Sequence, residues 1–412
     1  MPKLSIIIPT RDRADTLVHT LRTIVGQDYQ ACEILVSDNA SIDNTREVVG
    51  SFSDARIRYV NTGERVSMSG NWEFALRHAQ GKFVTYIGDD DGFIPGAIGR
   101  AMDLLDSSSL SALVWDKAQY SWPDHIDESA RNTLYFRPRN AAVRVVNGKK
   151  KLKQVLRFRE MYERLPCLYN GIVLKALITK TAESSTNGVF FNSIAPDVFS
   201  GIALSVGIGT YLLSEYPFSV NGASRHSNGT SIMSLQGTAL DSPATKFLKE
   251  NSREYDSRLM MTPALPTYIM GEYLLAKQYL PSFDFPEPHW DSYVRMLIRT
   301  ARSSKRSAEI LQSASHTVKV LGMRIRVPDR VEVSPARRNT GMHGDTFFVT
   351  PPAAMASNIY DACQLMAGLL PKDIEGVVSM SRSSFVRKLL ARSVAHIGSY
   401  LLSEAKTAYR SL

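Results

Sequence analysis

Short apolar runs alternate with amphipathic segments over residues 1–115 of the chain. The amphipathic segments have helical spacing, and in the first of them Leu17, Leu21 and Ile24 fall on one stripe. The apolar runs have the pattern of strands buried on both faces; they are Leu4–Ile8, Cys32–Asp38, Arg56–Val60, Lys82–Ile87 and Ser111–Trp115. Alternation of this kind predicts an α/β domain.

The connections between these predicted strands and helices are short, which favours parallel strands joined by right-handed crossovers. We therefore expect a doubly wound sheet, and such sheets bind ligands at the carboxyl ends of their strands. Polar residues follow three of the strands: Thr10–Arg13 after the first, Asp38 after the second and Asp89–Asp91 after the fourth. The sequence thus predicts that three polar clusters meet at one edge of the sheet.

The regular alternation stops over about residues 120–166, where basic, aromatic and proline residues mix as they do in an insertion. After the first 235 residues the chain has mostly helical patterns. Within this last part, residues 322–334 suggest a hairpin and residues 337–358 suggest a loop. We therefore predict two domains, 1–235 and 236–412, of which the second is mostly helical.

The composition, with 44% hydrophobic and 22% charged residues, is that of a folded protein and excludes a disordered chain. No run of about 18 apolar residues is present, so the sequence predicts no membrane span. The N-terminus lacks the pattern of a signal peptide. Its three cysteines are scattered, which predicts reduced thiols in a cytoplasmic protein.

The formal net charge is +9, and basic residues gather late in the chain, at 299–309, 322–330 and 384–393. One interpretation is solubility alone. The other is attraction to anions, which would be the phosphates of a lipid-linked substrate or the inner face of a membrane. Nucleic acid is not expected, because no nucleic-acid motif accompanies the charge.

Three adjacent carboxylates, Asp89, Asp90 and Asp91, follow the fourth predicted strand. Like charges repel, and capping of the next helix requires only one carboxylate. A divalent cation removes the repulsion, and Mg²⁺ or Mn²⁺ is commonly held by one or two carboxylates together with substrate phosphates. Neighbours in an extended chain face opposite ways, so we expect one of the three to bind something else.

The turn after the first strand contains neither a dinucleotide fingerprint nor a P-loop. Four ordered segments instead resemble family 2 glycosyltransferases of the GT-A fold. The resemblance covers roughly Leu4–Gly229. The segments are "SIIIPTRDRADTLVHTLRTIVGQDY", "EILVSDNASIDNT", "NWEFALRHAQGKFVTYIGDDDGFIPGAI" and "PDVFSGIAL".

The resemblance implies a nucleotide-binding set spread over three strand ends. Its members are Pro9, Thr10, Arg11, Arg13, Asp38 for the base and Asp89 for the ribose or a second contact. It also implies that Asp90 binds the cation, with Asp91 as a weaker candidate. Gly88 stands where the family often has an aspartate, which leaves open which of the three acidic residues ligate the metal.

The resemblance further implies that Asp197 is the general base, whereas the residues alone equally allow an aspartate favoured by a helix N-terminus. In the loop that follows, Arg225 is a candidate for neutralising phosphate. His226 is a candidate metal ligand, although a lone loop histidine is more often just solvated. We expect Trp72 to face the core rather than to stack on a sugar.

Together these features predict a metal-dependent, inverting transferase that moves one sugar from a nucleotide sugar, foremost a UDP-sugar, to a glycan or lipid-linked acceptor. The motif of processive members is absent, which favours transfer of a single sugar. Two alternatives stay open: a sugar nucleotidyltransferase, and an inactive carbohydrate-binding or scaffold protein. Assembly into a homo-oligomer and peripheral membrane contact are also left open.

Overall fold

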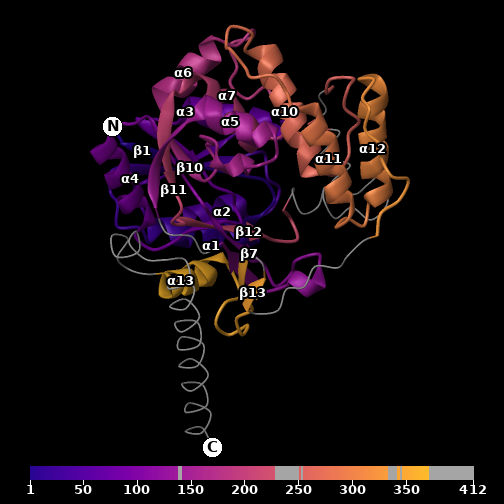
Figure 1. Cartoon of the computed structure of the whole chain (residues 1–412). Helices are drawn as coiled ribbons and strands as arrows, with labels where there is room; N and C mark the ends of the chain where they lie inside the picture. The colour runs from indigo at the N-terminus through magenta and orange to yellow at the C-terminus, as the bar shows by residue number, and fades with distance from the viewer. Residues whose placement is uncertain (138–141, 228–249, 252–253, 333–340, 344–345, 371–412) are drawn as a thin grey trace, which may run out of the picture.

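The computed structural model describes residues 1–137, 142–227, 250–251, 254–332, 341–343 and 346–370. Within these residues the chain forms one large and one small sheet, with helices on both faces of the large one (Figure 1). The predicted α/β class is therefore confirmed.

The large sheet has eight strands among the described residues. In spatial order they are β3 (Ile57–Asn61), β2 (Cys32–Asp38), β1 (Leu4–Thr10), β4 (Phe83–Tyr86), β10 (Gly171–Leu174), β6 (Ala112–Trp115), β11 (Thr210–Ser214) and β9 (Val143–Asn147). The strands β1 to β4 are parallel, as predicted. Between β4 and β6, however, β10 runs antiparallel to both.

The five predicted strands do run in one direction, because β10 is antiparallel to both β4 and β6, but the antiparallel strand between these two was not predicted. The fifth predicted strand, β6, is separated from the fourth by a strand that comes almost 60 positions later in the sequence. An apolar run shows that a strand is buried, but it carries no information on the strand's direction or neighbours. The sheet is mixed, because β10 within it and β9 at its edge run antiparallel to the predicted strands.

Two hydrophobic cores lie on opposite faces of this sheet. Ile6 and Ile8 of β1 point into one core, and Ile7 between them points into the other, as the alternation of side chains along a strand requires. The first core is covered by α1 (Ala14–Val25) and α4 (Ala97–Ser108). The second is covered by helices that include α3 (Met68–His78), α5 (Gly148–Leu156), α6 (Lys175–Glu183) and α7 (Pro196–Gly207).

The small sheet lies beyond the carboxyl edge of the large one. Its described strands, in order, are β13 (Gly341–His343), β14 (Thr346–Val349), β8 (Thr133–Phe136), β7 (Ala118–Ser121), β12 (Ser219–Ala223) and β5 (Gly92–Phe93). Residues 337–358, predicted to be a loop, thus contribute two strands. They are short and lie beside prolines and glycines, so their pattern did not stand out from loop sequence.

The last third of the chain contains several helices, as predicted: α10 (Leu265–Tyr279), α11 (Trp290–Ala301), α12 (Ser307–Val320) and α13 (Ile359–Leu369). In Figure 1, α10 stands beside α7, α11 and α12 follow outward from it, and α13 lies below α1. The hairpin predicted at 322–334 is wrong over 322–332, which contain no strand; residues 333–334 lie outside the described ranges.

The boundary predicted near residue 235 stays a prediction, but the segments on its two sides share both cores. The strand β14 pairs with β8, α13 packs against α1, and α10 packs against α7. Across the described ranges, no helix has the length and apolar character needed to cross a bilayer. All three cysteines are buried and unpaired, as predicted.

Because α13 shares a core with the N-terminal strands, Met366→Ala should destabilise the whole fold. Met366 is fully buried in that core, and its truncation should cost about 2–5 kcal/mol of the free energy of unfolding. Urea unfolding followed by tryptophan fluorescence should show one transition that moves to lower urea. Met261→Ala, at a position 41% exposed, is the matched control and should change little. Two independent transitions would contradict the shared core.

Candidate functional site

A cavity of about 480 Å³ opens beyond the carboxyl ends of β1, β4 and β6, where the sequence predicted that polar clusters meet. From the strand ends it is lined by Pro9, Thr10, Arg11, Arg13, Asp89 and Asp90. From the later part of the chain it is lined by groups that include Tyr162, Glu163, Asp197, Leu265 and Tyr268. The cavity thus brings together most of the predicted site residues.

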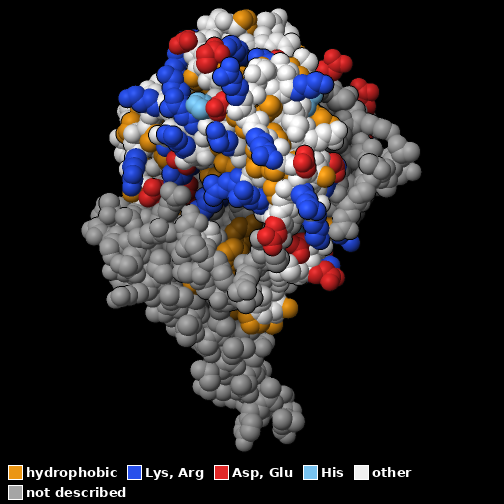
Figure 2. All heavy atoms as spheres, turned by 45° about the vertical axis from the view of Figure 1, so that its right-hand side comes forward, with side chains coloured by type: hydrophobic (Ala, Val, Ile, Leu, Met, Phe, Trp, Pro, Cys, Tyr) orange, Lys and Arg blue, Asp and Glu red, His pale blue; other side chains and the backbone are white. Residues whose placement is uncertain are grey.

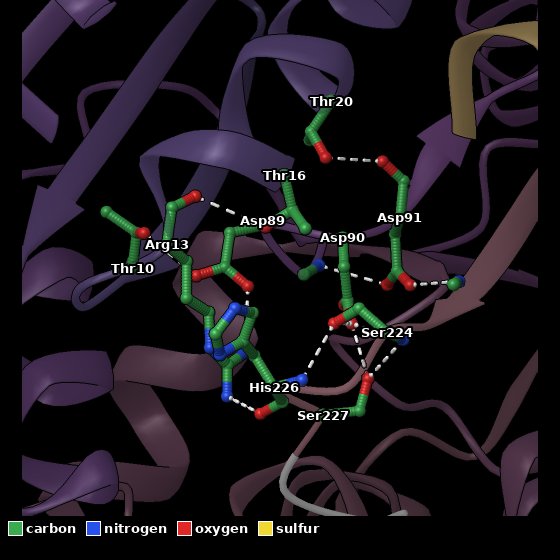
Figure 3. A network of polar contacts seen from close by, with 12 residues as sticks. Thr10, Arg13, Thr16, Thr20, Asp89, Asp90, Asp91, Ser224, His226 and Ser227 are labelled. Carbon is green, nitrogen blue, oxygen red and sulfur yellow. Dashed lines mark hydrogen bonds and ion pairs between the residues drawn. The ribbon is translucent and has the colours of Figure 1, made fainter. Parts of the chain in front are cut away.

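Asp89 is bound to the turn that follows β1. Its two carboxylate oxygens accept hydrogen bonds from the Thr10 hydroxyl at 2.8 Å and from the Arg13 guanidinium at 2.9 Å. Burial raises the pKa of Asp89 above its ordinary value; the Arg13 cation opposes this shift, and the Asp90 anion adds to it. Figure 3 shows Arg13 extending from the start of α1 toward Asp89 and the backbone oxygen of His226.

Asp90 faces the segment that follows β12. Its Oδ2 accepts hydrogen bonds from the Ser224 hydroxyl at 2.8 Å, from the Ser224 N–H at 3.3 Å and from the Ser227 hydroxyl. All three of these donors reach the same oxygen. Among the described residues Oδ1 therefore has no recorded hydrogen-bond donor, and it belongs to a residue that lines the cavity.

Asp91 is fully buried and does not line the cavity, and Figure 3 shows its carboxylate apart from those of Asp89 and Asp90. It accepts hydrogen bonds from the Tyr169 hydroxyl, from the Gly222 N–H at 2.7 Å and from the Gly88 N–H at 3.0 Å. Burial, with a contribution from the Asp90 anion, raises the pKa of Asp91 to about 7. The three aspartates thus face three different sets of donors.

The same contacts explain Gly88, where the family pattern often has an aspartate. A Cβ atom at this position would lie 2.7 Å from the Tyr169 hydroxyl and 2.9 Å from a carboxylate oxygen of Asp91. Gly222 is still more confined, because its Cβ would lie 1.7 Å from the backbone oxygen of Asp90. Both glycines are therefore fixed by the packing around the acidic residues.

Asp38 is buried behind the cavity wall rather than on it. Its carboxylate accepts hydrogen bonds from the Tyr59 hydroxyl at 2.5 Å, the Asn61 amide at 3.0 Å and the Ser41 N–H at 3.0 Å. The next residue, Asn39, does line the cavity. Contact of Asp38 with a nucleotide base stays a prediction.

Arg11 lines the cavity and forms an ion pair with Glu250 at 2.9 Å. By contrast, Arg225 and His226 do not line it. Both side chains lie near Asp15, at 3.8 Å from Arg225 and 3.5 Å from His226. The predicted phosphate and metal roles of these two residues stay predictions that the arrangement in this structure does not support.

Asp197 lies in the first turn of α7, which begins with Pro196 at a position where proline is well tolerated. Its carboxylate accepts a hydrogen bond from the Tyr162 hydroxyl at 2.8 Å, and both residues line the cavity. Burial and, after it, the Asp197 anion raise the pKa of Tyr162 well above its ordinary value. Tyr162 therefore stays a hydrogen-bond donor that orients Asp197 across the physiological pH range.

Trp72 was predicted to face the core, and this is confirmed. It is 5% exposed and stacks on Tyr86 with ring centroids 4.3 Å apart. Its remaining edge borders the cavity.

Several residues that line the cavity were not predicted. Lys117 follows β6, and its ammonium group lies 5.5 Å from the centre of the Tyr169 ring. Its position directly after the fifth predicted strand was a signal that could have identified it. The Arg164–Asp116 ion pair, with contacts of 2.8 and 2.7 Å, ties Lys117 to the segment that carries Tyr162 and Glu163.

The donor set for a divalent cation is small. Among the described residues, no group of three or more His, Cys, Asp or Glu side chains converges on one point. Of the three aspartates that follow β4, Asp90 is the one with a carboxylate oxygen that no hydrogen-bond donor among the described residues reaches. One carboxylate fits a cation whose other ligands are phosphate oxygens and water, and it does not fit a site built only from protein groups.

Residues 5–163 match the sequence profile described as Glycosyl transferase family 2. Over these residues the chain is similar to that family. The match covers the strand ends that carry Thr10, Asp38 and Asp89–Asp91, and it agrees with the GT-A fold that the sequence predicted.

Two curated relatives are similar to part of the chain. A Campylobacter jejuni GalNAc(5)-diNAcBac-PP-undecaprenol beta-1,3-glucosyltransferase is 40% identical over 25% of this chain and 34% of its own. The Escherichia coli UDP-Glc:alpha-D-GlcNAc-diphosphoundecaprenol beta-1,3-glucosyltransferase WfgD is 30% identical over 26% of this chain and 43% of its own. The matched region thus spans less than half the length of either relative.

Two solved structures also align with the chain. S. aureus TarS 1-349 in complex with UDP-GlcNAc has 14% identity and a TM-score of 0.42, with 77% of this chain and 71% of that chain covered. The mannosyltransferase PcManGT from Pyrobaculum calidifontis, with GDP-Man and Mn2+, has 18% identity and a TM-score of 0.39, with 77% and 81% covered.

The raised pKa of Asp91 predicts a pH dependence of stability. A carboxyl group whose pKa rises on folding, here from 3.8 to about 7, stabilises the native state below about pH 4 and loses that contribution as pH rises through about 7. The free energy of unfolding of the wild type should therefore fall between these pH values relative to that of Asp91→Asn. Urea titrations of both proteins at each pH provide the measurement.

The comparison with the variant is needed because Glu272 titrates over the same range. Burial raises the pKa of Glu272 to about 7 as well. That contribution is common to both proteins and cancels in the difference. Parallel stability curves would mean that Asp91 does not titrate in this interval.

Proposed function

We propose that this chain transfers a single sugar from a nucleotide sugar, foremost a UDP-sugar, to a hydroxyl group of a lipid-linked glycan. The observation that carries the proposal is the meeting of Arg13, Asp89, Asp90 and Asp197 in one cavity at the carboxyl edge of a family 2 sheet. The names of the relatives support the proposed donor and acceptor. Both names describe glucosyltransferases with undecaprenol-linked diphosphate substrates, and one of them includes UDP-Glc.

The cationic side of the cavity suits a nucleoside diphosphate. Arg13 is held by Asp89 and extends into the cavity, and Arg11 lies beside it. In a site shielded from water, such fixed charges stabilise the negative charge that develops on a departing diphosphate. Asp90 would hold a magnesium or manganese ion together with the phosphate oxygens, and the bound ion would supply further positive charge at the leaving group.

The part of the cavity wall that carries Asp197 suits an acceptor hydroxyl. Asp197 accepts the hydroxyl proton as the oxygen attacks the sugar, a general-base role that typically contributes 10²- to 10⁴-fold to the rate. Tyr162 keeps the carboxylate oriented through its 2.8 Å hydrogen bond. Attack on the side opposite the leaving diphosphate inverts the anomeric carbon. The 120–166 insertion supplies Tyr162 and Glu163 to this wall, which supports its predicted role on the acceptor side.

The test is release of nucleotide from a panel of UDP- and GDP-sugars, with an undecaprenyl-diphosphate-linked sugar as acceptor, with and without Mn²⁺. Metal-dependent release coupled to a product longer by one sugar is expected. Binding of glycan without turnover would identify a carbohydrate-binding or scaffold protein instead. Formation of a nucleotide sugar with release of pyrophosphate would identify a nucleotidyltransferase.

Asp90→Ala should abolish the part of UDP affinity that depends on Mn²⁺, because it removes the carboxylate with a free oxygen at the cavity. Isothermal titration with UDP, in Mn²⁺ and in EDTA, measures the effect. Asp329→Ala, at an exposed position in the C-terminal third, is the matched control and should bind as the wild type does. Unchanged affinity of Asp90→Ala in Mn²⁺ would remove Asp90 from the metal role.

Asp197→Asn should retain UDP binding and lose transfer. The amide still accepts the Tyr162 hydrogen bond but cannot take up a proton, so kcat should fall by about 10²- to 10⁴-fold with little change in donor KM. Tyr162→Phe, which frees the carboxylate but keeps it basic, should show a smaller loss. Turnover near the wild-type rate in Asp197→Asn would exclude this residue as the base.

We also propose cytoplasmic placement with peripheral contact to an anionic membrane, which would bring the enzyme to a lipid-linked acceptor. Figure 2 shows Lys and Arg side chains spread over the upper part of one face. Exposed arginines of the last third of the chain include Arg295, Arg299, Arg302 and Arg324; residues 384–393 lie outside the described ranges. Co-sedimentation with vesicles containing anionic lipid, but not with neutral ones, is the expected result.

A further inference from the structure

The six residues Phe190–Ala195 lead into α7, and their backbone is held by carboxylates from two different helices. At one end, Glu73 of α3 accepts hydrogen bonds from the Phe190 and Phe191 N–H groups, both at 3.1 Å. At the other end, Glu272 of α10 accepts from the Ile194 N–H at 3.0 Å and the Ala195 N–H at 2.9 Å. The segment is thus fixed at both ends by side chains distant in sequence.

The second of these contacts holds the residues immediately before α7. Ala195 is the N-cap residue of this helix, and its methyl group cannot accept a hydrogen bond. The Glu272 carboxylate binds the N–H groups of Ala195 and of Ile194 before it, and so fixes the point at which the helix begins. Because these groups are buried, leaving them unpaired would cost about 1–3 kcal/mol each.

Glu272 itself is fully buried, in an apolar stretch of α10. A buried carboxylate is costly unless donors surround it, and here a third donor, the Tyr255 hydroxyl, reaches the same oxygen at 2.9 Å. Burial raises the pKa of Glu272 to about 7, while the hydrogen bonds oppose the rise. An acid kept in such an environment is expected to serve a specific contact.

We propose that Glu272 is a positioning residue that fixes the start of α7 and thereby directs the Asp197 carboxylate into the cavity. Asp197 lies two residues after Ala195, so a shift of this backbone moves its side chain directly. Tyr162 holds the Asp197 carboxylate, and Glu272 holds the backbone N–H of Ala195, two residues earlier. The inference rests on the proposed role of Asp197 as the base.

The same helix also forms part of the cavity wall. Leu265 and Tyr268 of α10 line the cavity, about two turns and one turn before Glu272, respectively. All three residues lie outside the family match at 5–163 and outside the resemblance, which ends near Gly229. The structure therefore assigns α10, from the last third of the chain, to the site.

The test compares Glu272→Leu, which has similar volume but no acceptor, with Glu272→Gln, which keeps an acceptor oxygen. Glu73→Leu is the matched control, because it removes the carboxylate at the other end of the same segment. Hydrogen–deuterium exchange over residues 190–200 measures the backbone, UDP titration measures donor binding, and sugar transfer gives kcat and KM. If Glu272→Leu fails to fold, Glu272→Asp is measured in its place, because it withdraws the carboxylate by one methylene.

In Glu272→Leu, we expect exchange at Ile194 and Ala195 to become at least about 10-fold faster, since a local hydrogen-bonded unit is opened. UDP affinity should stay unchanged and kcat should fall about 10²-fold, the usual cost of a displacement near 1 Å. Glu272→Gln should bring both the exchange rate and kcat back to within a few-fold of the wild-type values. Glu73→Leu should speed exchange at Phe190 and Phe191 with a smaller loss of kcat.

Unchanged exchange in Glu272→Leu would overturn the inference, and so would equal losses of kcat in Glu272→Leu and Glu73→Leu. A wild-type protein without transfer activity would instead refute the proposed function. In that case the exchange measurements still decide whether Glu272 fixes the start of α7.

Discussion

Three adjacent carboxylates can be buried at the end of a strand only if each has its own donors. Within a low-dielectric interior, neighbouring negative charges and lost hydration both raise the energy of the ionised state. Here Asp89 is bound by the turn after β1, Asp90 by the segment after β12, and Asp91 by Tyr169 and Gly222. The donors come from parts of the chain that are up to about 200 residues apart, so the acidic sequence requires the complete fold around it.

The small sheet supplies several of the hydrogen-bond donors that these carboxylates require. The strand β12 lies beside β5 and β7, and its last residues bring the Gly222 N–H to Asp91 and the Ser224 hydroxyl to Asp90. The same strands place Gln119 and Asn221 on the cavity wall. The small sheet therefore holds the acidic residues and shapes the space in which a ligand would lie.

The sequence predicted the parts of the site that lie at strand ends. Thr10, Arg13 and Asp89 could be placed together because parallel strands end at a common edge, and the structure brings them within hydrogen-bond distance. The insertion of β10 and the return of β14 could not be predicted, because strand order depends on packing between distant segments. For the same reason neither Tyr162 nor Tyr268 stood out, since nothing local distinguishes them from core aromatics.

Glu272 did leave a local signal, an acidic residue inside the apolar run "YIMGEYLLA", but the sequence gives no indication of its partner. Gly88 depends on a distant residue in a different way. It is confined by Tyr169 and Asp91, and Tyr169 lies 81 residues later in the chain. An aspartate at position 88, as the family pattern often has, would require both the Tyr169 hydroxyl and the Asp91 carboxylate to move. In the natural history of such chains, an aspartate at position 88 should therefore be inherited together with a changed residue at position 169 or 91.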